Sequence, residues 1–431
     1  MADQSIIRIT KEIGEIQKNS DLSLAVAFRD RDVRNVKAMI IGPHETPYEF
    51  GFFENTPASR PRSPAPRPMV VVVASIQIFI PAENTWRGEP GEEWSAAQGL
   101  ESILLSIQSL MSSNPYENEP GFEHANDTSD KANQRDYVAK IRHETLRISV
   151  IQKLEDILGL TSANDSPATP IEYDPQTDGL DLDDSGAIWE PFKDLYKRRF
   201  LWYHDTYIEA IKDAKKDVKD GQAFTRMPFE GGSNTMEGKF NYTELEKRLQ
   251  NIKIALNVEL DRWATEGLSA KNKDTTVPVN LSRQFDQIKE SFKRGDVPHN
   301  VELENGNPFV WVITYFGRPM TNFDGGMFRI KLHFSPRFPD EQPRVKFLTP
   351  VFHHRVTSDG ILCYIPNPNR CDDVKQHIEA IFNALEEENP PYDPRTQVHP
   401  EAHRLYWGGA EGRKIYNRKL RRSVQRSMED F

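Results

Sequence analysis

The sequence predicts an α+β fold, in which antiparallel strand meanders are flanked by helices, and three observations lead to this interpretation. Apolar residues recur at helical spacing in residues 5–18 and again in residues 281–294. Apolar and alternating runs that are typical of strands follow each of these helices. An acidic stretch rich in Asp, Ser, Thr and Pro, residues 158–184, divides the chain. Because 431 residues exceed what one hydrophobic core usually organises, we expect two domains.

Composition excludes several classes of protein. The formal net charge of −10 argues against nonspecific binding to nucleic acid, which needs a basic surface. No run approaches the roughly 18 to 20 apolar residues of a membrane span, and the N-terminus lacks the apolar core of a signal peptide. We therefore expect a cytoplasmic or nuclear protein that binds neither membrane nor nucleic acid. Two cysteines, Cys363 and Cys371, are too few for a disulfide framework or a cysteine-based zinc site, so no metal is expected.

The first domain is predicted to begin as a helix followed by a strand meander. Residues 54–68 interrupt this meander, because a segment so dense in Pro, Arg and Ser can form neither a central strand nor a helix interior. We expect a flexible loop there. The other expected elements are a helix at 5–18, strands within 22–42, turns at 42–51, one or two strands at 69–80 and a helix within 92–115.

Helical periodicity returns after the acidic stretch, in residues 189–267. The aromatic cluster of Phe200, Trp202, Tyr203 and Tyr207 suggests that these helices pack on another element. A second polar stretch leads into the last domain. We therefore divide the chain into a first domain, an acidic disordered linker, a helical connector and a last domain, with limits at 1–157, 158–188, 189–270 and 271–431.

The last domain is predicted to contain a helix, three strands and further helices. Residues 308–317 are nearly all apolar, as in a strand that is buried on both faces. Phe328, Ile330 and Leu332 alternate with polar residues, which indicates a half-buried strand. The other expected elements are a helix at 281–294, a strand at 344–349, helices at 374–388 and 399–407, and a basic helical tail at 411–431.

Residues 316–364 hold turn and strand motifs in a fixed order. They contain a Gly-Gly-x-Phe strand, the sequence FSPRFPDEQPRVKF and an Asp-Gly-x-x-Cys closure that ends at Cys363. This stretch, with the helix before it and the helices after it, resembles the core of the ubiquitin-conjugating enzymes. The resemblance implies the fold of that family, and it places the catalytic cysteine, which carries the modifier as a thioester, at Cys363.

The resemblance also implies three further site residues. Members of the family have an aromatic-His-Pro-Asn motif before the cysteine, and here the matching residues 352–355 read Phe-His-His-Arg. His353 matches the family's His, but Arg355 stands in place of the Asn, and the Pro is missing. Asp393, which precedes a Pro, resembles the family's Asp near the incoming lysine. The catalytic residues implied by the resemblance are thus Cys363, Asp393, Arg355 and His353.

A physical requirement for catalysis by Cys363 is independent of the resemblance. A thioester carrier needs a thiol on an accessible, irregular segment, and Cys363 lies between Ser358-Asp359-Gly360 and Pro366. The alternative is a buried apolar cysteine among its neighbours Ile361, Leu362 and Tyr364. For Asp393 the alternative is a carboxylate that merely forms an Asp-Pro turn. A sulfur atom sealed in the core would contradict the catalytic hypothesis.

The function implied by the resemblance is that of a transferase. It would take ubiquitin or a ubiquitin-like protein from an activating enzyme and pass it, with a ubiquitin ligase, to lysines of substrate proteins. No bound cofactor is needed, because ATP is used by the upstream activating enzyme. The missing Pro-Asn pair favours an alternative, in which the domain is a catalytically inactive variant that acts as a scaffold or regulator in ubiquitination.

The first domain resembles the same family a second time, in residues 8–16, 42–53 and 84–88 and in the helix that follows. Residues 1–150 contain no cysteine, so this copy cannot form a thioester. It is therefore predicted to be an incomplete copy of the fold that binds partners. The abrupt change of sequence between Glu54 and Asn84 has a second explanation, a gene-model or splicing fault, which sequencing the transcript across residues 50–90 would test.

Overall fold

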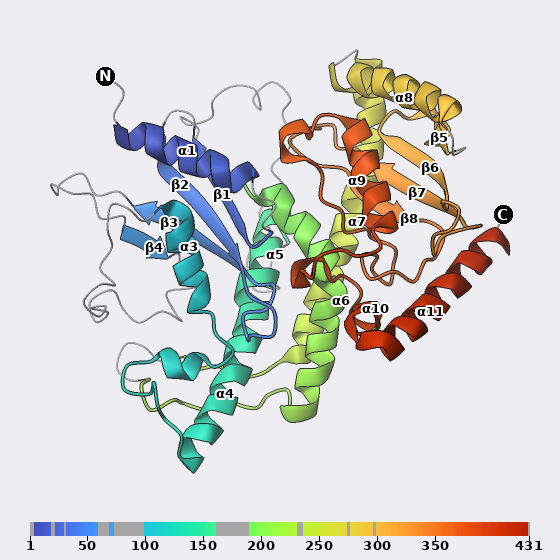
Figure 1. Cartoon of the computed structure of the whole chain (residues 1–431). Helices are drawn as coiled ribbons and strands as arrows, with labels where there is room; N and C mark the ends of the chain where they lie inside the picture. The colour runs from blue at the N-terminus through green and yellow to red at the C-terminus, as the bar shows by residue number, and fades with distance from the viewer. Residues whose placement is uncertain are drawn as a thin grey trace. The chain divides into compact units, whose positions relative to one another are not determined.

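The computed structural model describes two compact units, one built from Met1–Tyr196 and Ala214–Ile252 and the other from Lys197–Asp213 and Lys253–Phe431 (Figure 1). Helices α6, Lys193–Asp217, and α7, Tyr242–Asn272, contribute residues to both units. They confirm the helical pattern predicted for residues 189–267. The described residues are 4–18, 22–29, 32–58, 69–72, 99–160, 189–230, 236–273, 276–295 and 299–429.

The predicted linker falls largely outside the described residues, which omit 161–188. Its first residues belong to the end of a helix, since α5, Lys153–Leu158, is closed by Gly159 at a φ of 65°. The limits proposed for the four domains stay predictions. Among the described residues, no helix combines the length and the apolarity that crossing a bilayer requires.

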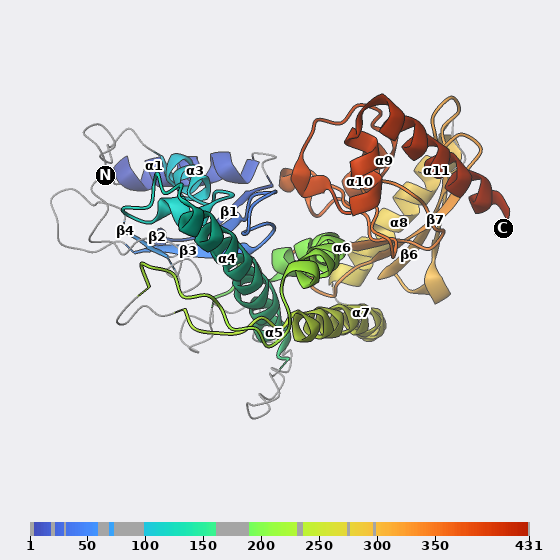
Figure 2. The same ribbon diagram turned by 90° about the horizontal axis from the view of Figure 1, so that it is seen from below.

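The first unit is a four-stranded antiparallel sheet covered by helices. Its strands follow one another in the order β1-β2-β3-β4, as a meander does. Helices α1 and α3 lie side by side on this sheet (Figure 2), and Ile13, Ile16 and Leu104 bring their apolar faces into its core. The elements are α1 Gln4–Lys18, β1 Leu24–Arg29, β2 Asp32–Ile41, β3 Phe52–Ala58, β4 Met69–Val72, α3 Leu100–Ser109, α4 Thr128–Glu144, a π-helical segment Thr145–Gln152, and α5.

One prediction for the first unit was wrong. Glu54–Ala58, expected to begin a flexible loop, belongs to β3, and β4 pairs with it. The reason is local: Pro57 is paired with Val70 of β4, whereas the pairing of β3 with β2 stops at Asn55. A proline without an N–H is tolerated where the strand is bonded on one side only. The rest of the predicted loop, residues 59–68, lies outside the described residues, as do residues 73–98.

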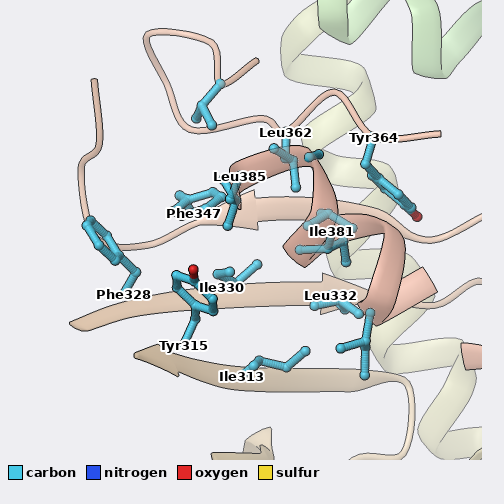
Figure 3. Close-up of a cluster of buried hydrophobic side chains, with 14 of the residues drawn as sticks. Ile313, Tyr315, Phe328, Ile330, Leu332, Phe347, Leu362, Tyr364, Ile381 and Leu385 are labelled. Atoms are coloured by element: carbon cyan, nitrogen blue, oxygen red, sulfur yellow. The ribbon is translucent and has the colours of Figure 1, made fainter. Parts of the chain in front are cut away.

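The second unit repeats the same plan, with a four-stranded antiparallel sheet in the order β5-β6-β7-β8. The predicted alternation in β7 is confirmed, because Phe328, Ile330 and Leu332 are fully buried. Figure 3 shows Ile381 and Leu385 of α9 facing these strand residues. The elements are α8 Thr276–Arg294, β5 Asn300–Leu303, β6 Val310–Phe316, β7 Met327–His333, β8 Arg344–Phe347, α9 Val374–Glu386, α10 Pro400–Trp407 and α11 Gly409–Glu429.

A glycine turn between two strands recurs in both units. In the first unit Gly42 N donates to Gly51 O at 2.9 Å, and a Cβ at Gly42 would lie 1.7 Å from Tyr48 O. In the second unit Gly317 N donates to Gly326 O at 2.9 Å, and a Cβ at Gly317 would lie 1.7 Å from Phe323 O. Since no side chain fits in either place, the same close approach of backbone fixes both turns.

The segment that carries Cys363 is held against β8 by its own backbone. Lys346 pairs with Ile361, and Phe347 N donates to Gly360 O at 2.7 Å. Gly360 has a φ of 93°, and a Cβ there would lie 2.6 Å from Phe347 O. Glycine is therefore required at this bend for two reasons, the left-handed conformation and the nearby carbonyl.

We predict that Gly360→Ala destabilises the protein by at least about 1–3 kcal/mol, the usual cost of a strained backbone conformation. Urea denaturation compares its unfolding midpoint with that of Gly325→Ala, a matched control. Gly325 also has a positive φ, of 76°, but a Cβ there would meet nothing within 4 Å. Gly360→Ala should lose more stability than the control, and equal losses would contradict the proposed clash with Phe347.

Candidate functional site around Cys363

Backbone pairing brings Cys363 next to Arg355. Val356 pairs with Leu362, and Cys363 N donates to Arg355 O at 2.8 Å. The predicted motif at residues 352–355 and the predicted cysteine thus lie on adjacent, antiparallel stretches of the segment after β8. Asp393 is also near, because its charge acts on the Cys363 thiol. Three of the four residues predicted from the sequence are brought together here.

The sulfur atom is not accessible, which contradicts the expectation of an exposed thiol. Cys363 has no exposed surface. Burial raises the pKa of the Cys363 thiol to about 11, an effect that the charges of Arg355 and Arg199 oppose and that of Asp393 increases. At this pKa the group is a neutral thiol at physiological pH.

Helix α6 places charged and polar side chains near the buried thiol. Its Tyr203 is fully buried and donates its hydroxyl to Arg395 O at 3.0 Å. Burial raises the pKa of Tyr203 to about 12, and the electrostatic effect of Cys363 on this hydroxyl shows that the two groups are close. Arg199, one turn earlier on the same helix, is also near the thiol. We call Arg199, Tyr203, Asp205 and Glu209 the α6 cover.

Cys363 is itself one of the buried residues of the hydrophobic core. Its neighbours Leu362 and Tyr364 belong to the main core cluster of the second unit. Burial has the largest effect on the ionisation of the Cys363 thiol, and the charges of Arg355, Arg199 and Asp393 have smaller effects. The alternative of a buried cysteine therefore describes the exposure of Cys363 correctly, with charged groups also acting on the thiol.

Polar contacts hold the α6 cover on the loop that precedes the cysteine and on helix α10. Asp205 Oδ2 accepts a hydrogen bond from Ser358 N at 2.8 Å, and Arg404 Nη1 pairs with Glu209 Oε1 at 2.6 Å. Although burial opposes it, hydrogen bonds from His204 and Ser358 lower the pKa of Asp205 to about 2. The carboxylate is therefore ionised in the pH range where proteins work, and its bond to the loop is charge-assisted.

Arg355 is enclosed rather than free to reach a substrate. It is 8% exposed, and its Nη2 pairs with Glu387 Oε2 at 3.3 Å. Its Nε has no hydrogen-bond partner within the described part of the chain. The guanidinium group thus keeps an unused donor close to the sulfur, at the position where the resemblance expects an Asn.

His353 is a buried, neutral ring. Its Nδ1 accepts a hydrogen bond from Arg355 N at 3.2 Å, which ties the two ends of the motif together. Burial lowers the pKa of His353 to about 3, with smaller effects of the same sign from Arg355 and His399. These contacts give His353 a role in ordering the loop, and its predicted catalytic role stays a prediction.

Asp393 forms the turn that was the alternative for this residue. Its Oδ1 accepts hydrogen bonds from Arg395 N at 2.9 Å and from Arg395 Nε at 2.8 Å, at the start of the 3₁₀ turn Pro394–Thr396. The same carboxylate is close enough to raise the pKa of Cys363. The structure therefore shows Asp393 as a turn-capping residue, and its catalytic role stays a prediction.

Comparison with known proteins decides the family. A family model described as ubiquitin-conjugating enzyme matches two separate stretches of the chain, residues 8–145 and 281–395. The protein belongs to the ubiquitin-conjugating enzyme family. The second stretch contains Arg355, Cys363 and Asp393, whereas the first contains no cysteine.

Similar relatives are vertebrate proteins named ubiquitin-conjugating enzyme E2 Z. The chain is 36% identical over 272 residues to the one from Danio rerio, covering 59% of this chain and 70% of the relative. It is 31% identical over 268 residues to the one from Xenopus tropicalis, covering 58% of this chain and 72% of the relative. For the one from Homo sapiens the values are 31% over 269 residues, 58% and 64%.

Two residues of this conjugating-enzyme site, Arg199 and Tyr203, are absent from the candidates drawn from the sequence. They lie on α6, outside both stretches that match the family. The aromatic cluster indicated that this helix packs on something, but not on what. The spacing of Arg199, Tyr203 and Tyr207, which places them on one helix face, is the signal that could have singled them out.

The second cysteine, Cys371, also has charged neighbours, Arg198 and Asp372. Cys371 is half-buried in the turn after Pro368–Arg370, and its Sγ donates to Pro368 O at 3.2 Å. Burial raises the pKa of this thiol as well. Within the ranges described, His, Cys, Asp and Glu side chains form no group of three or more that could hold a metal ion.

We predict that Tyr203→Ala makes Cys363 reactive towards iodoacetamide. Removing the ring lets water reach the sulfur, and a pKa that falls from about 11 towards the ordinary value of about 8.5 gives on the order of 100-fold more thiolate at neutral pH. The rate of alkylation is measured by mass spectrometry in a Cys371→Ser background, at several pH values.

The matched control for this measurement is Tyr392→Ala, which removes a tyrosine that is 55% exposed in the same unit. Cys363 of the control should be alkylated as slowly as Cys363 of the protein that keeps Tyr203. Rapid alkylation of Cys363 with the cover intact would contradict the burial described above.

Proposed function

We propose that this protein is a ubiquitin-conjugating enzyme that accepts ubiquitin or a ubiquitin-like protein on Cys363. While the α6 cover is in place, this thiol is inaccessible and unreactive. The observation that carries the proposal is the surroundings of the sulfur. Cys363 closes the Asp-Gly-x-x-Cys motif that resembles the family's, it lies within a stretch that matches the family model, and the charges of Arg355, Arg199 and Asp393 act on its thiol. Charged neighbours of this kind suit a thiol that ionises during a reaction.

The reaction consists of two acyl transfers. In the first, the Cys363 thiolate attacks the carbonyl carbon of the modifier's thioester on the activating enzyme. A new S–C bond forms, the old one breaks, and the released cysteine of the activating enzyme takes up a proton. In the second, a neutral lysine amine attacks the new thioester, an amide forms, and Cys363 leaves as a thiolate. This chain binds no cofactor, since ATP is consumed by the activating enzyme.

Two side chains have roles in this chemistry. Arg355 supplies positive charge beside the sulfur, and its free Nε donor is suited to an oxyanion that develops on the carbonyl. The Asp393 carboxylate orients the lysine ammonium and accepts its proton. His353 holds the backbone of Arg355 in place and acts as a positioning residue.

The cover has to move before either step. With a pKa of about 11, on the order of one thiol in ten thousand is ionised at pH 7, and no acyl group can reach it. The closed state also carries a cost. Arg199 is 6% exposed, and its Nε and Nη1 have no partner among the described residues. Each buried, unsatisfied polar group costs about 1–3 kcal/mol, which offsets part of the stability that the packing of α6 provides.

A second candidate function rests on the same burial. In the noncatalytic alternative the domain keeps the fold of the family, uses its surfaces to bind ubiquitin, an activating enzyme or a ligase, and never acylates Cys363. Arg355 in the place of Asn favours this alternative, because its charged guanidinium group is enclosed and its Nη2 is paired with Glu387.

For the first unit, we propose an incomplete second copy of the conjugating-enzyme fold that binds partners. The matching four-stranded meanders and the two glycine turns, at Gly42 and Gly317, support a common fold. The absence of cysteine from residues 1–150 excludes a thioester there. We expect the protein to act in the cytoplasm or nucleus, together with a ubiquitin ligase and substrate proteins.

The test is a thioester assay with activating enzyme, ATP and a panel of ubiquitin-like proteins. We expect an adduct that reducing agents remove, that Cys363→Ser abolishes and that Tyr203→Ala forms faster than the unmodified protein. Cys371→Ser serves as the matched control and should load normally. If Tyr203→Ala exposes a reactive thiol but no modifier forms an adduct, the noncatalytic alternative is correct.

A further prediction separates the roles of Arg355 and its partner. Arg355→Ala should slow the discharge of the loaded thioester onto free lysine by about 10²-fold, the usual effect of losing one oxyanion donor. Loading itself should change less. Glu387→Gln, which keeps the guanidinium group but removes the charge that pairs with it, is the control. Equal discharge rates for both variants would exclude a direct role of Arg355.

A further inference from the structure

A groove beside α11 has no part in the chemistry proposed for Cys363. It encloses about 650 Å³, within the roughly 300–1,000 Å³ range typical of binding pockets. Its walls are the residues that follow β8, the loop 357–360 and the last turns of α11. All of these belong to the second unit.

The charge of the groove is one-sided. Lys346, Arg422 and Arg426 line it, and the side chains of the three make no hydrogen bond or ion pair with any described residue. A fourth cation, Lys419, is paired with Glu401. The acidic side chain in the lining is Asp359, whose carboxylate is already engaged by Lys253 at 3.2 Å.

Apolar side chains form another part of the lining. Leu348 is 42% exposed there. Phe352 also contributes, but its half-buried ring already contacts His399 and Tyr416, at 5.1 and 5.9 Å between centroids. Lys419 lies over the same ring, 5.1 Å from its centroid. These contacts leave less of the ring for stacking on a nucleic-acid base.

We propose that this groove binds an acidic segment of a partner protein, an extended peptide with Asp or Glu side chains beside apolar ones. The three uncommitted cations match the carboxylates, and Leu348 matches an apolar side chain of the peptide. Single-stranded nucleic acid is disfavoured by the partly covered Phe352 ring and by the net charge of −10. The inference goes beyond the proposed activity, because it holds whether or not Cys363 is acylated.

The groove lies beside the loop that leads to Cys363. Ser358 and Asp359 in its wall are the residues that Asp205 and Lys253 hold, and the same loop leads to Cys363. A partner docked through an acidic segment would therefore sit next to the thiol site.

The experiment measures fluorescence anisotropy of a labelled peptide with four Asp-Asp-Leu repeats, titrated with the full chain. Saturable binding that weakens as salt rises is expected. The double variant Arg422→Glu/Arg426→Glu should weaken it by roughly tenfold or more, since it removes two charge pairs and adds repulsion. The matched control, Arg418→Glu/Arg421→Glu, changes two exposed arginines of the same helix outside the groove and should leave affinity within about twofold.

Circular dichroism of both double variants checks that they fold, which is expected because all four positions are exposed. Three results would overturn the proposal: no saturable binding of the peptide, an equal loss of affinity in both variants, or equally tight binding of a neutral peptide with Asn in place of Asp. Tighter binding of a single-stranded oligonucleotide, lost in the groove variant, would assign the groove to nucleic acid instead.

Discussion

The packing of α6 on the segment that holds Cys363 is the interaction on which the properties of the site depend. The thiol is removed from water, and this desolvation raises its pKa to about 11, although the charges of Arg355 and Arg199 lower it. The polar contacts of this cover are the Tyr203 hydroxyl on Arg395 O, the Asp205 carboxylate on Ser358 N and the pair of Glu209 with Arg404. Buried side chains of the same helix, among them Phe200, Tyr207 and Ile211, add apolar packing.

Below the cover, the geometry of the site is fixed by backbone rather than by side chains. The bridges from β8 to residue 361 and from Val356 to Leu362 place Cys363 against Arg355, and Gly360 permits the bend between them. His353 completes this frame from the other end of the motif.

The surface of the second unit combines two neighbouring features with different physical bases. At Cys363 the neighbouring charges are buried. They lower the stability of the fold, because Arg199 and Arg355 have N–H donors without hydrogen-bond partners among the described residues. In the groove beside α11, the charges of Arg422 and Arg426 are exposed and solvated. Buried charges favour a change of state, whereas solvated ones favour salt-sensitive binding of an opposite charge. The loop 357–360 lies between the two.

The sequence alone determined the local elements and the family. The alternation at Phe328, Ile330 and Leu332 predicts the half-buried strand correctly, because the side-chain period of a strand is a local property. The order of motifs up to Cys363 identifies the family, because turn and strand motifs can also be read directly from the sequence. Pro57 was misjudged, since its tolerance depends on which neighbouring strand bonds to it. The exposure of Cys363 was decided by the tertiary structure, because Tyr203 and Arg199 reach it from a helix distant in sequence, and no pattern within either segment encodes their contact.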